Sequence, residues 1–479
     1  MADVSPREDA SRPSAQLGLW DAVSIIIGIV VGAGIYETPP LIFRNVPGPW
    51  TGLAVWIIAG GLSLVGALCY AELATAYPRS GGDYVYLTRA YAPSVGFLYG
   101  WAQLAVILTG SIGMMAYIFA DYAVKIWPGS SVLYASAAIV VLSILNLLGV
   151  AFGKRTQNLL TLSKVLGLGG ILVAGLFWGA PSEVGRGTTP LAFESIAFAM
   201  VLVFITYGGW NDAAYVAADV HDGRRNIPRS LILGTVAITA IYLVVNVAYL
   251  WGLGFEGVRN SSAVAVDVLA QPLGKWGATA MSLLVMISAL GAVNGLIFTG
   301  SRLYSAVGTD HSVFAWLGRW HPRLGTPVGA LLAQAIISGA MVIAVGTSFG
   351  QSGINALVGK LTGETVAWEG RGGFELLLRC TAPVFWLFFL LTAISLFVLR
   401  VRERNVERPF TVPFYPWVPL LFCLTCGYML YSAVLYAGML GLVGGSLLVI
   451  GLPFYWMSRR TVPIDERHRH SPAVSLEGE

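Results

Sequence analysis

Long apolar runs, separated by short polar breaks, follow one another along the whole chain. Each run holds about 20 residues, enough for an α-helix to cross the roughly 30 Å hydrocarbon core of a bilayer. Twelve such runs begin near Trp20, Trp50, Tyr91, Ser131, Asn158, Leu191, Ser230, Trp276, Pro327, Cys380, Phe414 and Met439. The pattern predicts an all-α integral membrane protein with twelve transmembrane helices and no separate soluble domain.

The composition supports this class of protein. Of the 479 residues, 56% are hydrophobic and 11% are charged, whereas a soluble domain carries about 25% charged residues. The polar stretch before the first run lacks a short apolar core and a small-residue cleavage site, so we expect no removable signal peptide. The net charge of +4 gives no indication of a nucleic-acid partner.

The distribution of lysine and arginine predicts the orientation of the chain. If the N-terminus is cytoplasmic, 20 of the 29 basic residues lie on the cytoplasmic side, eight lie on the other side and one, Lys164, lies inside a run. The excess alternates from loop to loop, and basic residues favour cytoplasmic loops. We therefore expect a multi-pass protein of the cell membrane (plasma or inner), with both termini in the cytoplasm.

Two of the predicted helices are interrupted by glycine near their middles, within residues 28–36 and 204–211. A glycine inside a helix costs about 1 kcal/mol relative to alanine, and unpaired backbone at membrane depth is tolerated where it lines a cavity. The interrupted runs are the first and the sixth, which correspond if spans one to five and six to ten are copies of one unit. This arrangement predicts a binding site at the membrane midplane. Close helix packing is the alternative explanation.

Seven motifs occur in order between about Leu17 and about Arg460. They are Gly32-Ala33-Gly34-Ile35-Tyr36-Glu37-Thr38-Pro39; Tyr70-Ala71-Glu72-Leu73 with Pro78-Arg79-Ser80-Gly81-Gly82-Asp83-Tyr84; Tyr207-Gly208-Gly209-Trp210-Asn211; Arg225-Asn226-Ile227-Pro228-Arg229; Val293-Asn294-Gly295 with Ser301-Arg302-Leu303; His321-Pro322; and Arg408-Pro409-Phe410-Thr411-Val412-Pro413. With these motifs the chain resembles the amino acid–polyamine–organocation (APC) superfamily and, within it, a bacterial-type member of the L-type amino acid transporter (LAT)-like family.

The resemblance implies a LeuT-type fold, with two inverted five-helix repeats, broken helices 1 and 6, and two extra helices. The expected divisions are a cytoplasmic tail over residues 1–19, the first repeat over 20–180, the second over 190–401, the two extra helices over 413–458 and a cytoplasmic tail over 459–479.

An amino acid brings a carboxylate and an ammonium into a site that holds little water. Free N–H groups at the start of a half-helix suit the carboxylate, and freed carbonyls before each break suit the ammonium. The expected substrate-binding residues are Ile29, Val30, Gly32, Ala33, Gly34, Phe204, Ile205, Gly208 and Asn211. For Asn211 the resemblance implies substrate binding, and a hydrogen bond between helices is the alternative.

Three positions depart from the family pattern. Ala33 replaces the usual serine, so carboxylate binding there would rest on backbone alone. Ile205 stands where members that take large neutral amino acids usually have an aromatic gate. Glu37 replaces an apolar residue, and it could favour a cationic substrate from the outer vestibule or pair with Arg44.

Lys164 is a candidate coupling residue, because an ionisable group at membrane depth is expensive and usually functional. The resemblance places it where sodium-coupled relatives bind sodium, so a fixed cation would make sodium unnecessary. It is also a candidate proton carrier, and snorkelling to the interface is the alternative. Asn294 and Ser301, on the eighth span, are expected to complete this site or else to pack between helices.

These features predict a sodium-independent secondary active transporter of amino acids, working by alternating access through exchange (antiport) or proton coupling. A polyamine, cationic amino acid or amine transporter, or a transporter-like nutrient sensor, is the alternative. An enzyme is not expected, because the five histidines fall in loops or tails. We expect no cofactor and no metal site, and we expect the four cysteines to be structural.

Family members with a glycoprotein heavy chain join it through a cysteine between spans three and four. Residues 121–131 contain no cysteine. We therefore expect no covalent heavy-chain partner, and a chain that works alone in the lipid bilayer as a monomer.

Overall fold

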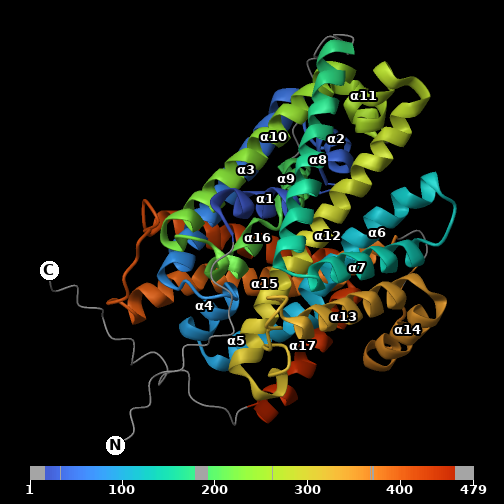
Figure 1. The fold of residues 1–479 in the computed structure, drawn as a ribbon. Helices are drawn as coiled ribbons and strands as arrows, with labels where there is room; N and C mark the ends of the chain where they lie inside the picture. Colours follow the sequence, from blue (N-terminus) through green and yellow to red (C-terminus); the bar gives the residue numbers. More distant parts are fainter. Residues whose placement is uncertain are drawn as a thin grey trace, which may run out of the picture.

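The computed structural model describes residues 17–32, 34–178, 193–261, 263–366, 368 and 372–458. Within these residues the regular structure is helical, apart from a single β-bridge between Leu17 and Val220. Figure 1 shows the helices packed into a bundle, in which α10 lies against both α3 and α8.

The first five spans begin with a broken helix. Its halves are bent by 52° relative to each other, and the glycines between them explain the break. The elements are α1 (Leu19–Val30), α2 (Gly34–Arg44), α3 (Pro49–Ala76), α4 (Asp83–Ala90), α5 (Pro93–Ala102), the π-helical η1 (Gln103–Ile107), α6 (Leu108–Ile126), α7 (Ser131–Leu147) and α8 (Val150–Trp178).

The next five spans also begin with a broken helix, in which an α-helix is followed by a 3₁₀ segment. The elements are α9 (Phe193–Tyr207), η2 (Trp210–Asp219), α10 (Gly223–Asn260), α11 (Val264–Leu273), η3 (Gly274–Trp276), α12 (Gly277–Asp310), η4 (Ser312–Phe314), α13 (Val328–Gly346), α14 (Ser348–Thr362) and α15 (Gly373–Arg402). Two more helices, α16 (Trp417–Ala437) and α17 (Met439–Ser458), complete the described chain.

The spans agree with the predicted class. Nine helices of the described chain are long and apolar enough to cross a membrane, or ten if the bent pair α1–α2 counts as one span. Adding the shorter helices α7 and α9 gives the predicted twelve. The protein is therefore an all-helical, multi-pass membrane protein.

Three helices begin several residues before the apolar runs that predict them. Helices α10 and α15 begin at Gly223 and Gly373, whereas their runs begin near Ser230 and Cys380. Helix α8 begins at Val150, whereas the fifth apolar run begins near Asn158. The first turns of α8 are polar because they contact charged groups at the end of the bundle, where Lys154 lies 3.1 Å from Asp21. Because these first turns are polar, the hydrophobicity pattern places the start of α8 too late in the sequence.

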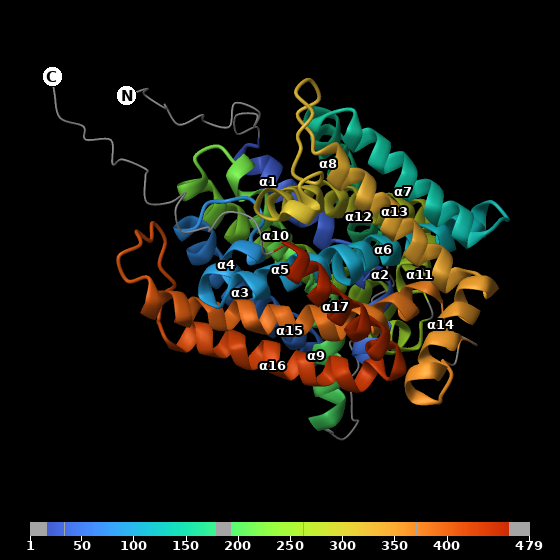
Figure 2. The same cartoon turned by 90° about the horizontal axis from the view of Figure 1, so that it is seen from below.

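Helices that correspond in the two five-helix units lie against each other. Helix α3 contacts α10, α6 contacts α12, and α7 contacts α13. These are the second, third and fourth members of each unit. Helices α15 and α16 lie side by side along one flank of the bundle (Figure 2). The contacts between corresponding helices are those expected of two repeats. The broken first and sixth spans also lie against each other, through α2 with α9 and α1 with η2.

Candidate functional site

The two helix breaks lie against each other at the centre of the bundle. Gly209 has a φ of +107°, and a Cβ atom there would lie 2.6 Å from Ile29 Cγ2. A Cβ atom on Gly34 would lie 2.8 Å from Thr206 Cγ2. Both glycines therefore allow close contact between the broken spans, and Gly209 also permits a backbone conformation that other residues avoid.

Tyr242 of α10 connects the two breaks. Its hydroxyl oxygen lies 2.9 Å from the carbonyl oxygen of Val30 and 3.1 Å from that of Thr206. The Tyr242 ring also packs against Trp56 of α3. A buried hydroxyl shared between two freed carbonyls satisfies backbone groups that the breaks leave without helical partners.

A cavity of about 180 Å³ lies beside the breaks. Its polar lining residues are Gln103, Ser111, Asn211, Asp212, Tyr215 and Thr381. Its walls are largely apolar and come from α1, η1, α6, α9, α12 and α15. The apolar lining residues are Ile29, Ile107, Leu108, Met114, Met115, Phe204, Ile205, Leu296, Phe374, Leu378, Phe385 and Trp386.

Five of the residues expected at the site line this cavity. They are Ile29, Phe204, Ile205, Gly208 and Asn211. A Cβ atom on Gly208 would approach only the carbonyl of Ile205 within 4 Å, at 3.3 Å, so the cavity side of this glycine is open. The sixth span therefore supplies a bare stretch of backbone to the cavity.

The other expected residues lie around the break of the first span. The carbonyl of Val30 already accepts hydrogen bonds from Tyr242 and from the Gly32 N–H. A Cβ atom on Gly32 would make ordinary van der Waals contact with Met115 Sδ, at 3.8 Å, and with the Val30 carbonyl oxygen, at 3.9 Å. Gly34 contacts Thr206, and Ala33 lies outside the described residues.

Lys164 of α8 is fully buried and reaches the break in the first span. Its Nζ atom donates to the carbonyls of Gly28 and Val31, each at 2.8 Å, and to that of Ser288 at 3.0 Å. These bonds use all three N–H donors of the ammonium. Lys164 therefore does not snorkel to the interface. It joins α8, the unwound end of α1 and α12.

The partner of Lys164 on the eighth span is Ser288, not the expected Asn294 or Ser301. Ser288 contributes its carbonyl, and its hydroxyl also donates to Val31 at 2.8 Å. Asn294 instead accepts a hydrogen bond from the Asn146 amide and donates one to Gln157, each at 2.8 Å. Asn294 is nearly two helical turns from Ser288, too far to reach the ammonium.

Ser301 also lies away from Lys164, at the end of the bundle that contains Leu17. Its hydroxyl donates to the Phe298 carbonyl at 2.9 Å and accepts from Arg302 at 2.9 Å. Arg302 is itself buried and pairs with Asp219 at 3.1 Å. Ser301 therefore supports an ion pair between α12 and the end of η2.

Beneath the cavity, a cluster of tyrosines around Asp83 closes the bundle. The carboxylate accepts hydrogen bonds from Tyr70 and, at 2.9 Å, from Tyr99. The Tyr99 hydroxyl lies 2.6 Å from that of Tyr215 on η2. Because these residues come from α3, α4, α5 and η2, the cluster holds the sixth span against the first unit. Asp83 belongs to a family motif, but nothing in the sequence places it beside three tyrosines.

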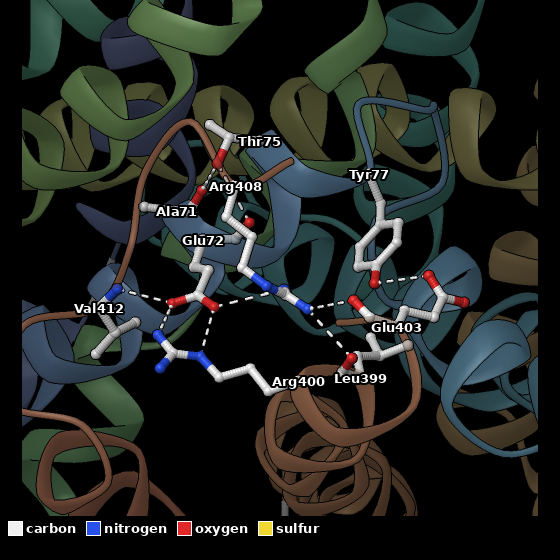
Figure 3. A network of polar contacts seen from close by, with 9 residues as sticks. All are labelled: Ala71, Glu72, Thr75, Tyr77, Leu399, Arg400, Glu403, Arg408 and Val412. Atoms are coloured by element: carbon white, nitrogen blue, oxygen red, sulfur yellow. Dashed lines mark hydrogen bonds and ion pairs between the residues drawn. The ribbon is translucent and has the colours of Figure 1, made fainter. Parts of the chain in front are cut away.

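A second network at the same end brings two family motifs together (Figure 3). Glu72 of α3 is fully buried, and Arg400 donates to both of its carboxylate oxygens. The Val412 N–H also donates to it at 2.7 Å, and Arg408 lies 3.5 Å away. The network fixes α15 and the segment that follows it to α3.

Glu37 and Arg44 do not form the expected ion pair among the described residues. Glu37 accepts a hydrogen bond from Tyr122 at 2.8 Å. Arg44 donates instead to the carbonyls of Arg259 and Ser261, at 2.6 and 3.1 Å. Both side chains line a separate pocket of about 410 Å³. Arg44 therefore binds backbone carbonyls at the end of α10, and not the carboxylate of the nearby Glu37.

Two broken helices that meet beside a cavity, within a helical membrane bundle, define the architecture of a membrane transporter. The family model described as amino acid permease matches residues 17–457, and the chain belongs to that family. It is 30% identical to the human b(0,+)-type amino acid transporter 1, over 88% of this chain and 82% of the human protein.

Two mouse proteins are also similar. The large neutral amino acids transporter small subunit 2 is 29% identical, with 95% of this chain and 84% of the mouse protein covered. The Asc-type amino acid transporter 1 is 28% identical, with 92% of this chain and 81% of the mouse protein covered.

Proposed function

We propose that the protein is a sodium-independent secondary transporter that exchanges α-amino acids across the cell membrane. The single observation that carries this proposal is the set of three hydrogen bonds from Lys164 to Gly28, Val31 and Ser288. These carbonyls come from the unwound end of α1 and from α12, which must keep their relative positions for the site to exist. A covalently attached cation satisfies them permanently, so no sodium ion needs to bind there.

The cavity beside the breaks is the proposed amino acid site. The carboxylate would bind at the N–H groups that begin α2, because the dipole of the half-helix favours an anion there. The ammonium would bind near the end of α1 and near Gly208, and Asn211 would complete the contact. The names of all three relatives, which are amino acid transporters, support this class of substrate.

The closed end of the bundle supports an arrangement that opens to the outside. In the proposed orientation both termini are cytoplasmic, and the Asp83 cluster and the Arg302–Asp219 pair form the inner barrier. Phe374 and Leu378 of the cavity lie in the first two turns of α15, whose last turn carries Arg400 at the closed end. The cavity is thus nearer the outer surface, and release inward requires these polar contacts to separate.

The proposed working unit is a single chain in the lipid bilayer, without a covalent heavy chain, because residues 121–131 offer no cysteine for a disulfide. The proposed division into two inverted repeats, over residues 20–180 and 190–401, is supported by the packing of corresponding helices.

The test is uptake by purified protein in liposomes preloaded with one unlabelled amino acid at a time. We expect labelled amino acid to enter only when a substrate amino acid is inside. A panel of polyamines and other amines tests whether the substrate is an amine and not an amino acid. An imposed pH gradient, in place of internal substrate, tests whether uptake is coupled to protons. Absence of exchange for every α-amino acid would refute the proposal, and uptake driven by the pH gradient alone would replace exchange with proton coupling.

A further inference from the structure

An acidic residue that the sequence motifs did not single out lines the cavity. Asp212 follows Asn211 at the start of η2, directly after the break in the sixth span, and it lines the cavity. Its side chain is buried, with the residue 6% exposed. A carboxylate is thus presented to the space in which the amino acid is proposed to bind.

This carboxylate has no cationic partner within the described part of the chain. Its side-chain hydrogen bonds come from the neutral groups of the neighbouring Asn211, at 3.3 Å, and of Tyr215. No described lysine or arginine lies within ion-pair distance of it, whereas the buried carboxylate of Glu72 pairs with Arg400 and Arg408. Burial without a cationic partner strongly disfavours the charged form of a carboxyl group. A cation that arrives with a ligand would stabilise that form, so this position is suited to one.

The remainder of the cavity suits a long side chain that ends in a positive charge. The apolar walls can contact an aliphatic stem, and the rings of Phe204, Phe385 and Trp386 line the same space. Aromatic faces attract ammonium and guanidinium groups that lie within about 6 Å of the ring centre. Gln103 and Ser111 add polar groups to the lining of the same cavity.

We infer that Asp212 determines specificity by binding the side-chain cation of the substrate, so that α-amino acids with an ammonium or guanidinium side chain are preferred. The inference rests on the proposed function, because it assumes that the backbone of the amino acid lies at the helix breaks. The acid proposed to bind a substrate cation is then Asp212, which lines the cavity. Glu37 lines a different pocket, where it accepts a hydrogen bond from Tyr122.

The test compares exchange of arginine, ornithine and leucine in liposomes by the natural protein, Asp212→Asn, Asp212→Glu and Glu407→Gln. Glu407 is an exposed acid whose loss is the matched control. We expect the natural protein to prefer arginine and ornithine over leucine. In Asp212→Asn the ratio of kcat/KM for arginine to that for leucine should fall at least about 30-fold. Asp212→Glu should restore part of it, and Glu407→Gln should leave it unchanged.

Three outcomes would overturn the inference. If the natural protein exchanges leucine but neither arginine nor ornithine, the specificity assignment fails while the proposed function stands. If Asp212→Asn reduces exchange of arginine and leucine equally, the residue is structural. If no α-amino acid is exchanged, the proposed function fails together with the inference.

A second measurement decides the matter if Asp212→Asn does not fold. Arginine should raise the Tm of the natural protein more than leucine does at equal concentration, because a ligand stabilises the state that it binds. A rise with leucine and none with arginine would overturn the inference.

Discussion

The Nζ atom of Lys164 lies 2.8 Å from the carbonyl oxygen of Gly28, although 136 residues separate the two in the sequence. The contact joins the fifth span to the unwound part of the first. It gives a fixed position to backbone that would otherwise have no hydrogen-bond partner at membrane depth. The same ammonium donates to the carbonyl of Val31, which directly follows α1. A single side chain thus binds the backbone on both sides of the point where the helix ends.

Replacing Lys164 by alanine should therefore impair transport. The variant removes the ammonium donor from three buried carbonyls, of which Val31 keeps the hydrogen bond from the Ser288 hydroxyl. A buried polar group left unsatisfied costs about 1–3 kcal/mol. We expect exchange to fall at least about tenfold, with a lower Tm. Lys275→Ala, on the exposed η3 segment, is the control that removes a lysine elsewhere. A Lys164→Ala protein that exchanges substrate at the natural rate would contradict this assignment.

The space around Lys164 gives an independent prediction at Gly291 of α12. A Cβ atom there would lie 3.0 Å from both Cε and Nζ of Lys164. Gly291→Ala should displace the ammonium and reduce exchange without removing a charge. Gly169→Ala on α8 is the matched control, because nothing lies within 4 Å of a Cβ atom at that position. Equal exchange rates in the two variants would show that the ammonium tolerates displacement.

Gly209 should be intolerant of a side chain for two reasons. Its φ of +107° is disfavoured for other residues, at a cost of about 1–3 kcal/mol, and a new Cβ atom would clash with Ile29 at 2.6 Å. We expect Gly209→Ala to lose exchange activity, because Ile29 lines the cavity. Gly427→Ala on α16, which has open space beside it, should behave as the natural protein does. Liposome exchange assays on both variants make the comparison.

Glu72→Gln should lower the Tm more than any exposed acid-to-amide change. Removing one member of a buried ion pair costs about 3–5 kcal/mol, and Glu72 is fully buried between Arg400 and Arg408. Glu407→Gln breaks an exposed pair with Arg224 and should have little effect. Thermal unfolding in detergent measures both variants, and similar Tm values would mean that the network does not stabilise the fold.

Stability should decrease in mild acid because of His311, which follows α12. Burial lowers the pKa of His311 below its usual value of 6.5, an effect that Asp310 opposes. Ser458 contacts Nδ1 at 3.2 Å, and the rings of Tyr84 and Phe97 pack against the imidazole. Below about pH 6.5 the unfolded chain binds a proton that the folded chain binds less readily, so folding loses free energy as the pH falls.

The test of this dependence is the Tm of the natural protein and of His311→Asn between about pH 7.5 and about pH 5, a range that includes the usual histidine pKa. The natural protein should lose more stability over this range than the variant. His321→Asn, at an exposed position, is the control and should follow the natural protein. Identical curves for the natural protein and His311→Asn would contradict the prediction.

The sequence predicted the helical spans and the location of the breaks, because both depend on local patterns. A run of apolar residues and a cluster of glycines have the same meaning in any membrane helix. Lys164 could be singled out in the same way, since one lysine inside an apolar run is conspicuous. Its three acceptors are backbone carbonyls, which no side-chain pattern reveals.

The contacts between distant motifs could not be predicted. Asn294 and Ser288 both lie on α12, and only the rotation of that helix decides that Ser288 faces Lys164. Arg44 had a nearby acid in the sequence, but carbonyls more than 200 residues away provide its acceptors. Asp212 could have been singled out as an acid inside a membrane span. The sequence reasoning missed Asp212 because it follows the glycine break, where the helical pattern ends.

The most direct test of the central claim, that the Lys164 ammonium replaces a sodium ion, is the initial rate of amino acid exchange by the natural protein in sodium chloride and in choline chloride at equal ionic strength. The account predicts the same rate in both salts. A rate that falls to the background of protein-free liposomes when sodium is removed would contradict it.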